Sequence, residues 1–253
     1  MRVLLRALLA LSLSLIVTGV QAELDLPSLL DQVRGSVVGI ASHDPLGAPR
    51  TQLSGTGFVV GDGLTVVTNA HVVRAIANGE KNLRLVVLVG RGPQPSVRTV
   101  EIVQEDAYHD IAVLRIAGPA VRALKLAAPG GVREGQSVAF TGFPIGAVLG
   151  LYPVTHAGIV SCIVPIATPQ SSTQSLSAAQ IKRLGRPFDV YQLDAIAYPG
   201  NSGSPVFDLR RGEVIAVVNS GLVKAAKESV LKDPSAITYA IPIQHLRDLL
   251  GPP

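Results

Sequence analysis

Glycine and proline are scattered along the whole chain and divide it into short apolar runs. The sequence holds 25 glycines and 18 prolines among 253 residues, and 47% of its residues are hydrophobic. Such residues mark tight turns, whereas short apolar runs between them are typical of strands rather than of a helical bundle. The pattern predicts an all-β fold with enough apolar residues for a sizeable core, either as one large domain or as two small ones.

Twelve runs have the length and composition of strands, six in each half of the chain. They lie at 37–41, 55–60, 64–68, 83–89, 98–104, 111–116, 137–142, 154–164, 190–194, 204–208, 214–219 and 237–242. Gly61-Asp62-Gly63 has the composition of a tight hairpin between the second and third runs. Six strands before residue 118 are enough to close one barrel, and the second half repeats this architecture without repeating the sequence.

Four other segments complete the predicted organisation. Residues 23–34 and 243–250 have apolar residues at helical spacing and predict short terminal helices. Residues 118–135 combine prolines and glycines around a short apolar run and predict the connection between the halves. Residues 167–187 are rich in serine and carry a basic cluster, so we expect an exposed, partly helical insertion.

The first 22 residues have the three parts of a secretory signal peptide. Arg2 and Arg6 form a basic start, residues 7–17 are broadly apolar, and Val20-Gln21-Ala22 ends in a small residue that suits cleavage. The alternative is an uncleaved membrane anchor, but the apolar run is shorter than the ~20 residues that a spanning helix needs. We expect residues 23–253 to form the mature chain, with no stable membrane insertion after cleavage.

Charge and cysteine content exclude further classes of protein. Without the first 22 residues the chain has 20 basic and 18 acidic residues, a formal charge of +2 that does not indicate a nucleic-acid partner. Cys162 is the single cysteine, so no intrachain disulfide forms even in an exported protein. This favours a bacterial periplasmic or secreted protein. Because Cys162 lies in a strand-like run, we predict a small buried apolar residue without a catalytic or redox role.

Residues 198–205 contain one serine, Ser202, beside glycines that free the backbone. A serine hydroxyl attacks poorly unless a base activates it and hydrogen-bond donors stabilise the resulting oxyanion. Without a Cβ, Gly200 can adopt a conformation that aims its own N–H and that of Ser202 at one point. We therefore predict Ser202 as a nucleophile and Gly200, Asn201 and Ser202 as the oxyanion hole.

The base and its partner are expected upstream of the serine. His71 lies in Thr68-Asn69-Ala70-His71-Val72-Val73 and Asp110 begins a strand-like run after His109, so the order along the chain is His, Asp, Ser. An α/β-hydrolase has the order Ser, Asp, His and a Gly-x-Ser-x-Gly motif, whereas the last position of that motif is Ser204 here. The α/β-hydrolases are therefore excluded, and the chymotrypsin order fits.

Three motifs carry a resemblance to a known family. TNAHVV at 68–73, HDIAVLRI at 109–116 and GNSGSP at 200–205 resemble the catalytic blocks of trypsin-fold serine proteases, most closely the bacterial HtrA (DegP-like) branch. The resemblance covers roughly residues 27–250 and implies two six-stranded antiparallel β-barrels, at about 36–117 and 136–243, with the cleft between them. Only a short tail follows residue 242, so we expect no C-terminal PDZ domain.

The resemblance also implies the chemistry. His71 would take the proton of Ser202 and pass it to the leaving amine, while Asp110 orients and stabilises the imidazolium. The expected function is a serine endopeptidase that acts through an acyl-enzyme on unfolded or exposed segments of exported proteins, without a cofactor. A catalytically silent trypsin-fold binding protein, or an esterase with the same triad, are the alternatives.

Two segments are expected to bind the substrate. The family pairs an extended peptide with the strand at Asn219, Ser220 and Gly221 by β-augmentation. The specificity pocket is expected at Ile196, Ala197 and Tyr198. Selectivity for Lys or Arg needs a carboxylate six residues before the serine, and Ile196 occupies that place. On the far wall Thr238-Tyr239-Ala240 stands where the family often has a glycine in deep pockets, so we expect a preference for small or medium aliphatic side chains.

Three further residues, His109, His156 and Ser204, stand near the predicted site residues. His109 neighbours Asp110 but is predicted to point to the opposite, solvent-facing side of a strand. The histidines show no metal-ligand spacing, so no metal site is predicted. His156 falls near the expected pocket without an assigned role. Ser204 stands where the family usually has a second glycine, and we expect a local packing adjustment there.

Overall fold

Two closed antiparallel barrels make up the computed structural model, which describes residues 25–79, 82–144, 150–166, 185–219 and 238–251. The first barrel has the strand order β1-β2-β3-β6-β5-β4 and closes where β4 pairs with β1. Its strands are β1 (Val37–His43), β2 (Thr51–Val60), β3 (Thr65–Thr68), β4 (Arg84–Val89), β5 (Ser96–Asp106) and β6 (Ile111–Ile116).

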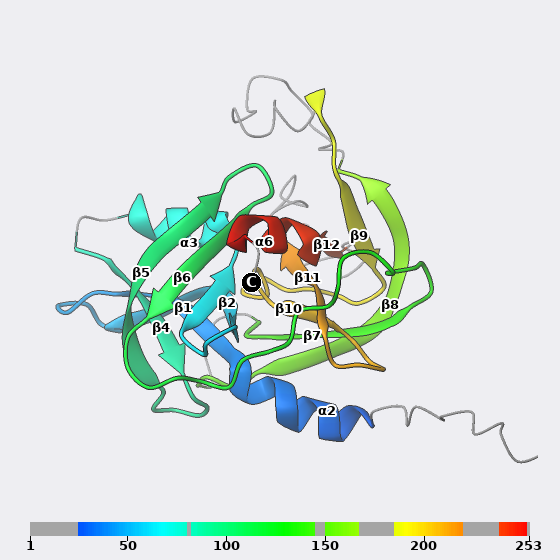
Figure 1. Cartoon of the computed structure of the whole chain (residues 1–253). Helices are drawn as coiled ribbons and strands as arrows, with labels where there is room; N and C mark the ends of the chain where they lie inside the picture. Colours follow the sequence, from blue (N-terminus) through cyan, green and yellow to red (C-terminus); the bar gives the residue numbers. More distant parts are fainter. Residues whose placement is uncertain (1–24, 80–81, 145–149, 167–184, 220–237, 252–253) are drawn as a thin grey trace, which may run out of the picture.

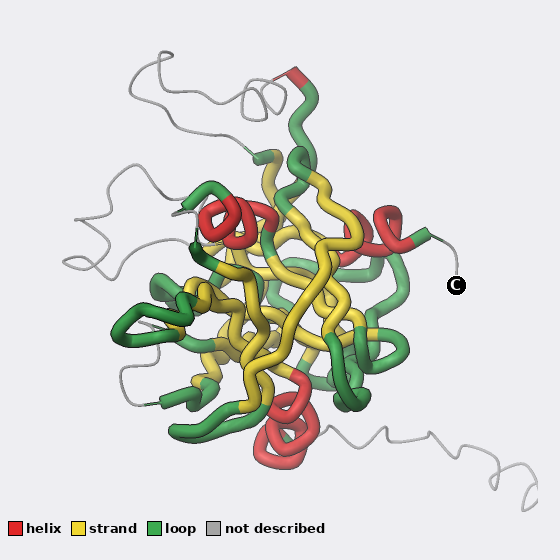
Figure 2. The backbone as a smooth tube through the Cα atoms, turned by 90° about the vertical axis from the view of Figure 1, so that its left-hand side faces the viewer, coloured by secondary structure: helices red, strands yellow, loops and turns green. Residues whose placement is uncertain are grey.

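The second barrel has the order β10-β11-β12-β9-β8-β7 and closes between β10 and β7. Its strands are β7 (Ser137–Gly142), β8 (Val154–Pro165), β9 (Asp189–Leu193), β10 (Pro205–Asp208), β11 (Val214–Asn219) and β12 (Thr238–Pro242). The two barrels lie side by side in Figure 1, and Figure 2 shows the helices at the periphery of the strands. The predicted fold class, two six-stranded barrels with short helices near both ends, is confirmed.

A shared apolar core lies between the barrels. It contains Phe58 and Val67 of the first barrel together with Phe207 and Val217 of the second, all fully buried. Each barrel also has an interior cluster of its own. The apolar runs of the sequence therefore form three buried clusters, and the one with members from both barrels holds the barrels against each other.

Two amphipathic helices add to this shared core. Helix α2 (Leu26–Val33) begins after Asp25, whose carboxylate accepts the Ser28 N–H, and buries Leu29 and Val33 four residues apart; the short helix η1 (Arg34–Ser36) follows it. Helix α6 (Ile243–Leu250) buries Leu246 and crosses the junction of the barrels, as Figure 1 shows in red.

The connection between the barrels is tied to both of them. Leu124 forms an isolated bridge with Val60 of the first barrel, and Leu126 forms one with Val214 of the second. The Arg247 side chain on α6 donates to the carbonyl oxygens of Leu126 and its neighbour Ala127 at 2.9 and 2.8 Å.

Three details differ from the sequence-based expectations or lie beyond the described residues. A helix, α3 (Ala70–Ala77), follows β3 where no element was predicted. Cys162 is half-buried rather than buried, because a bulge between Val160 and Cys162 shifts the side-chain alternation of β8; its thiol contacts the Glu134 carboxylate, which raises the pKa of the thiol. The predicted signal peptide and residues 167–184 of the predicted insertion lie outside the described residues.

Candidate active site between the barrels

Helix α3 places His71 at the edge of the first barrel. His71 is the second residue of the helix and follows Asn69, the residue that starts it. The Asn69 side chain and the Ala70 N–H both donate to the main-chain oxygen of Asp110, at 3.0 and 3.2 Å. The start of the helix is therefore bonded directly to Asp110, the residue predicted to orient His71.

Asp110 is almost fully buried, and its carboxylate accepts three hydrogen bonds. One carboxylate oxygen accepts the His71 N–H at 2.8 Å; the other lies 2.6 Å from Nδ1 of His71 and 2.8 Å from the side-chain nitrogen of Asn219. The backbone of Asp110 has φ 58°, a left-handed conformation that few residues other than glycine adopt. The tight turn before β6 thus aims the carboxylate at the imidazole instead of along a strand.

Ser202 comes from the second barrel and lies at the other ring nitrogen of His71. Its Oγ lies 3.2 Å from Nε2 of His71, and the residue is 5% exposed. The Ser202 carbonyl accepts the Thr56 N–H at 2.9 Å, a bond that crosses from one barrel to the other. Gly203 follows with φ 87°, and a Cβ there would lie 2.0 Å from the Thr56 carbonyl oxygen. Only glycine allows this approach.

The loop before Ser202 contains the predicted oxyanion donors. Gly200 has φ 101°, and its carbonyl oxygen accepts the Thr56 hydroxyl at 2.7 Å. The Gly200 N–H has no hydrogen bond within the part of the chain that the structure describes. The Asn201 N–H, in contrast, donates to the Tyr198 carbonyl at 3.0 Å and closes a turn. Of the predicted donors, Asn201 is therefore engaged inside the loop.

The predicted specificity segment has one exposed and two more enclosed residues. Ile196 is 38% exposed, whereas Ala197 is buried and donates its N–H to the Thr238 hydroxyl at 2.8 Å. Tyr198 is half-buried. Asn219 ends β11 and is fully buried, while Ser220 and Gly221 lie outside the described residues.

His156, for which the sequence predicts no role, lies beside this segment. Its ring stacks on Phe140 with centroids 5.0 Å apart and lies 5.9 Å from the Tyr198 ring. Its Nε2 is buried without a hydrogen-bond partner among the described residues, and burial lowers the pKa of His156. In the sequence, only the position of His156 near the expected pocket pointed to this placement. The stack on Phe140 follows from the pairing of β8 with β7, which brings the two residues opposite each other.

The structure contradicts the solvent-facing prediction for His109. Its side chain is 20% exposed, and Nδ1 donates to the Asp106 carboxylate at 2.5 Å. The prediction assumed a strand in which neighbouring side chains alternate. Residues 107–110 form a turn instead, so the alternation does not apply.

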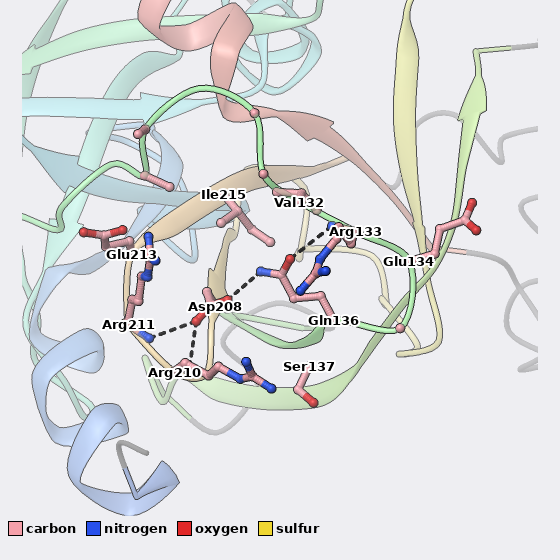
Figure 3. Close-up of a pocket in the computed structure, with 15 residues that line it drawn as sticks. Val132, Arg133, Glu134, Gln136, Ser137, Asp208, Arg210, Arg211, Glu213 and Ile215 are labelled. Carbon is pink, nitrogen blue, oxygen red and sulfur yellow. Dashed lines mark hydrogen bonds between the residues drawn. The ribbon is translucent and has the colours of Figure 1, made fainter. Parts of the chain in front are cut away.

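One cavity lies apart from these residues. It has a volume of about 480 Å³ and lies between the connection and the β10–β11 turn, where Asp208 accepts hydrogen bonds from Gln136 and from the main-chain N–H groups of Arg210 and Arg211 (Figure 3). None of the predicted site residues lines it. Its rim mixes arginines with Glu134 and Glu213, so it presents no single charge to a ligand.

The described residues contain neither a metal-binding cluster nor a membrane-spanning helix. They contain no group of three or more histidine, cysteine or acidic side chains arranged to hold a metal ion. No helix in this part of the chain is long and apolar enough to cross a membrane.

Comparison with known proteins gives the same fold and a family. The trypsin-like peptidase domain family matches residues 55–217. The mitochondrial serine protease HTRA2 of Drosophila virilis is 31% identical over 204 residues, which cover 81% of this chain and 40% of that protein. The serine protease HTRA1A of Danio rerio is 31% identical over 199 residues, covering 78% of this chain and 34% of that protein. The chain thus spans well under half the length of these relatives.

Solved structures extend the comparison over most of the chain. Deg5 superposes with a TM-score of 0.61 at 26% identity, covering 87% of this chain and 90% of Deg5. The HtrA-type protease AlgW, solved with a tripeptide, shares the fold with a TM-score of 0.62 at 19% identity, over 90% of this chain and 62% of AlgW. Together with the two barrels and the family match, these likenesses show that the chain belongs to the trypsin-like peptidase family and is HtrA-like within it.

Proposed function

We propose that this chain is a serine endopeptidase with Ser202 as nucleophile, His71 as general base and Asp110 as the group that orients His71. The observation that supports it best is the continuous chain of contacts Asp110–His71–Ser202, with 2.6 Å and 3.2 Å between the side-chain atoms. Residues 39 and 131 positions apart in sequence meet in the order that the mechanism needs.

In the proposed mechanism, Ser202 Oγ attacks the carbonyl carbon of the scissile peptide bond while Nε2 of His71 takes its proton. The C–N bond then breaks as His71 returns that proton to the leaving amine, which leaves an acyl-enzyme that water hydrolyses. Asp110 stabilises the imidazolium that exists between the two transfers. Because its carboxylate also accepts the Asn219 amide, it is held toward His71 and not toward solvent.

The N–H groups of Gly200 and Ser202 are the proposed oxyanion donors, since the Asn201 N–H is used within the loop. A polypeptide would bind in extended form against the end of β11. There the Asn219 side chain is already bonded to Asp110, so its main chain would make the pairing. Ile196 and Ala197 offer an apolar wall that suits small or medium aliphatic side chains and leaves a buried cation without a partner.

The site of action that we propose is the periplasm or the extracellular space of a bacterium. The support is the signal-peptide pattern of residues 1–22 and the single cysteine in the chain. The substrates would then be unfolded or exposed segments of exported proteins.

Replacement of Ser202 by alanine tests the assignment. The wild-type protein should react with a fluorophosphonate probe and digest unfolded casein, and Ser202→Ala should lose both activities by at least a thousandfold while its thermal unfolding stays near that of the wild type. Ser204→Ala is the matched control, because it removes a hydroxyl two residues away and should remain reactive with the probe.

The outcomes separate the alternatives. Wild-type protein that does not react with the probe would be a binding protein, and protein that reacts but leaves casein intact would be an esterase. Mass spectrometry of the casein fragments adds the specificity: cuts mainly after Lys or Arg would contradict the proposed aliphatic pocket.

A further inference from the structure

His109 lies at the centre of a ring cluster beside the proposed triad. Its imidazole stacks on that of His245 in α6, with centroids 3.8 Å apart and 15° between the planes. Phe188, just before β9, meets both imidazoles edge to face, at 4.7 Å from His109 and 5.0 Å from His245. The cluster thus joins a turn of the first barrel, a strand entry of the second and the helix near the C-terminus.

The His109 side of the cluster is fixed within its own turn. Besides the bond to Nδ1, the Asp106 carboxylate accepts the main-chain N–H groups of Tyr108 and His109, at 2.8 and 3.0 Å. Tyr108 packs edge-on against His109, and its hydroxyl donates to the Arg186 carbonyl in the second half of the chain. Because one carboxylate accepts three hydrogen bonds within residues 106–109, this turn is rigid.

The His245 side is fixed by helix α6. Ile243 and Leu246 on either side of His245 are buried in the core shared by the barrels, and Arg247 is bonded to the connection. The His245 ring is therefore a fixed surface against which the His109 ring rests.

The stiff turn ends at Asp110. The left-handed φ of 58° at Asp110 is uncommon outside glycine, and although aspartate tolerates it better than most residues, contacts with the surroundings help to hold it. Hydrogen bonds from the start of α3 and from Asn219 hold Asp110 itself, and the stack on His245 supports the preceding residue, His109.

We propose that His109 and His245 form a positioning clamp: stacking on the helix holds the turn 106–110 so that the Asp110 carboxylate stays aligned with His71. Neither histidine touches the reacting atoms, and both act through Asp110. The role in catalysis rests on the proposed function, whereas the role in holding Asp110 does not. A displacement of about 1 Å at a catalytic group costs up to a hundredfold in rate, which sets the scale of the effect.

Three variants of the full chain test the clamp. His245→Ala removes the stacking surface, His245→Phe keeps an aromatic ring there, and Leu250→Ala, at an exposed position of the same helix, is the control. For a peptide amide with an aliphatic residue before the scissile bond, we expect His245→Ala to lower kcat about tenfold with KM unchanged. His245→Phe and Leu250→Ala should stay within about twofold of the wild type.

A double-mutant cycle shows whether the two rings act together. If His245 acts through His109, the variant His109→Ala/His245→Ala should lose no more kcat than the worse of the two single variants. Losses that multiply would mean that the two rings act separately, and would overturn the clamp. So would a wild-type kcat in His245→Ala.

Hydrogen exchange provides a readout that needs no activity. The His71 N–H donates to the Asp110 carboxylate, so its exchange reports whether Asp110 is held in place. It should speed up about tenfold in His245→Ala and remain slow in His245→Phe. Unchanged exchange in His245→Ala would refute the clamp even if the wild type proved inactive, while failure of the proposed peptidase function would appear as wild-type protein that neither reacts with the probe nor cleaves casein.

Discussion

The hydroxymethyl group of Ser204 fits behind the proposed nucleophile because the residue that faces it has no side chain. Ser204 is fully buried, and its Oγ has no hydrogen-bond partner among the described residues. A Cβ built on Gly142 would lie 2.0 Å from this oxygen and 2.7 Å from Oδ1 of Asn201. The departure from the usual second glycine is thus accommodated across the strand pair β7–β10, as a packing adjustment.

This contact predicts that Gly142→Ala destabilises the protein and that Ser204→Gly relieves part of the loss. We expect Gly142→Ala to lower the free energy of unfolding by about 1–3 kcal/mol, because the new methyl overlaps the serine oxygen. The double variant should regain at least half of the loss, with Asn201 and the Thr56 hydroxyl accounting for the remainder. Denaturant unfolding of the wild type, the two single variants and the double variant gives the coupling free energy between the two positions. If Gly142→Ala lowered the free energy of unfolding equally with Ser204 and with glycine at position 204, Ser204 would not be the residue that obstructs the new methyl.

Individual site residues differed in how far the sequence revealed them. His71, Asp110 and Ser202 could be proposed from their order and flanking residues, since each has a distinctive local motif. The bond from Asn219 to Asp110 could not, because it joins the ends of strands in different barrels. His109 was placed wrongly because the sequence does not show that Asp110 has a positive φ and ends a turn.

At the level of elements, strands were predictable where apolar runs ended in glycine, proline or acidic turns. All twelve predicted strands are present, and the hairpin at Gly61-Asp62-Gly63 joins β2 to β3. No element was predicted for residues 70–77, where the prediction rested only on the motif around His71. Helix α3 forms there and buries Val72 and Val73 in the first barrel.

Helix α6 carries a titratable group that predicts pH-dependent stability. Burial and the neighbouring His109 lower the pKa of His245 to about 4, outweighing Asp106 and Asp248, which act in the opposite direction. In the unfolded chain this histidine titrates near its ordinary value of 6.5. Between these two values the unfolded state binds the extra proton, so stability falls as the pH drops from about 6.5 toward 4.

His245→Phe tests this dependence at the element that carries it. The variant cannot bind the proton, so its midpoint of thermal unfolding should fall less steeply than that of the wild type over the same pH range. Leu250→Ala, on the same helix, should keep the wild-type slope. Parallel curves for His245→Phe and the wild type would show that protonation of His245 does not oppose folding.

At the level of the whole molecule, the proposed triad exists only while the two barrels keep their relative position. His71 and Asp110 belong to the first barrel and Ser202 to the second, with Thr56 bonded across the junction to Gly200 and Ser202. Beneath these bonds lies the shared apolar core. Residues of both barrels, α2 and α6 are in contact within this core. If one barrel unfolded, the apolar side chains that the other barrel contributes to the core would be exposed to water.

This shared core predicts that the barrels unfold together and that one residue of α6 influences both. Leu246 is fully buried there, so Leu246→Ala should cost about 2–5 kcal/mol of unfolding free energy, whereas Leu250→Ala, 37% exposed, should cost far less. Calorimetry should show one transition for each protein, with equal calorimetric and van't Hoff enthalpies. Amide exchange in β3 and β11 should accelerate together in Leu246→Ala, because opening one barrel exposes the face that the other buries. Two separate transitions, or faster exchange confined to the second barrel, would show that the barrels are held independently and that the junction alone does not keep His71 facing Ser202.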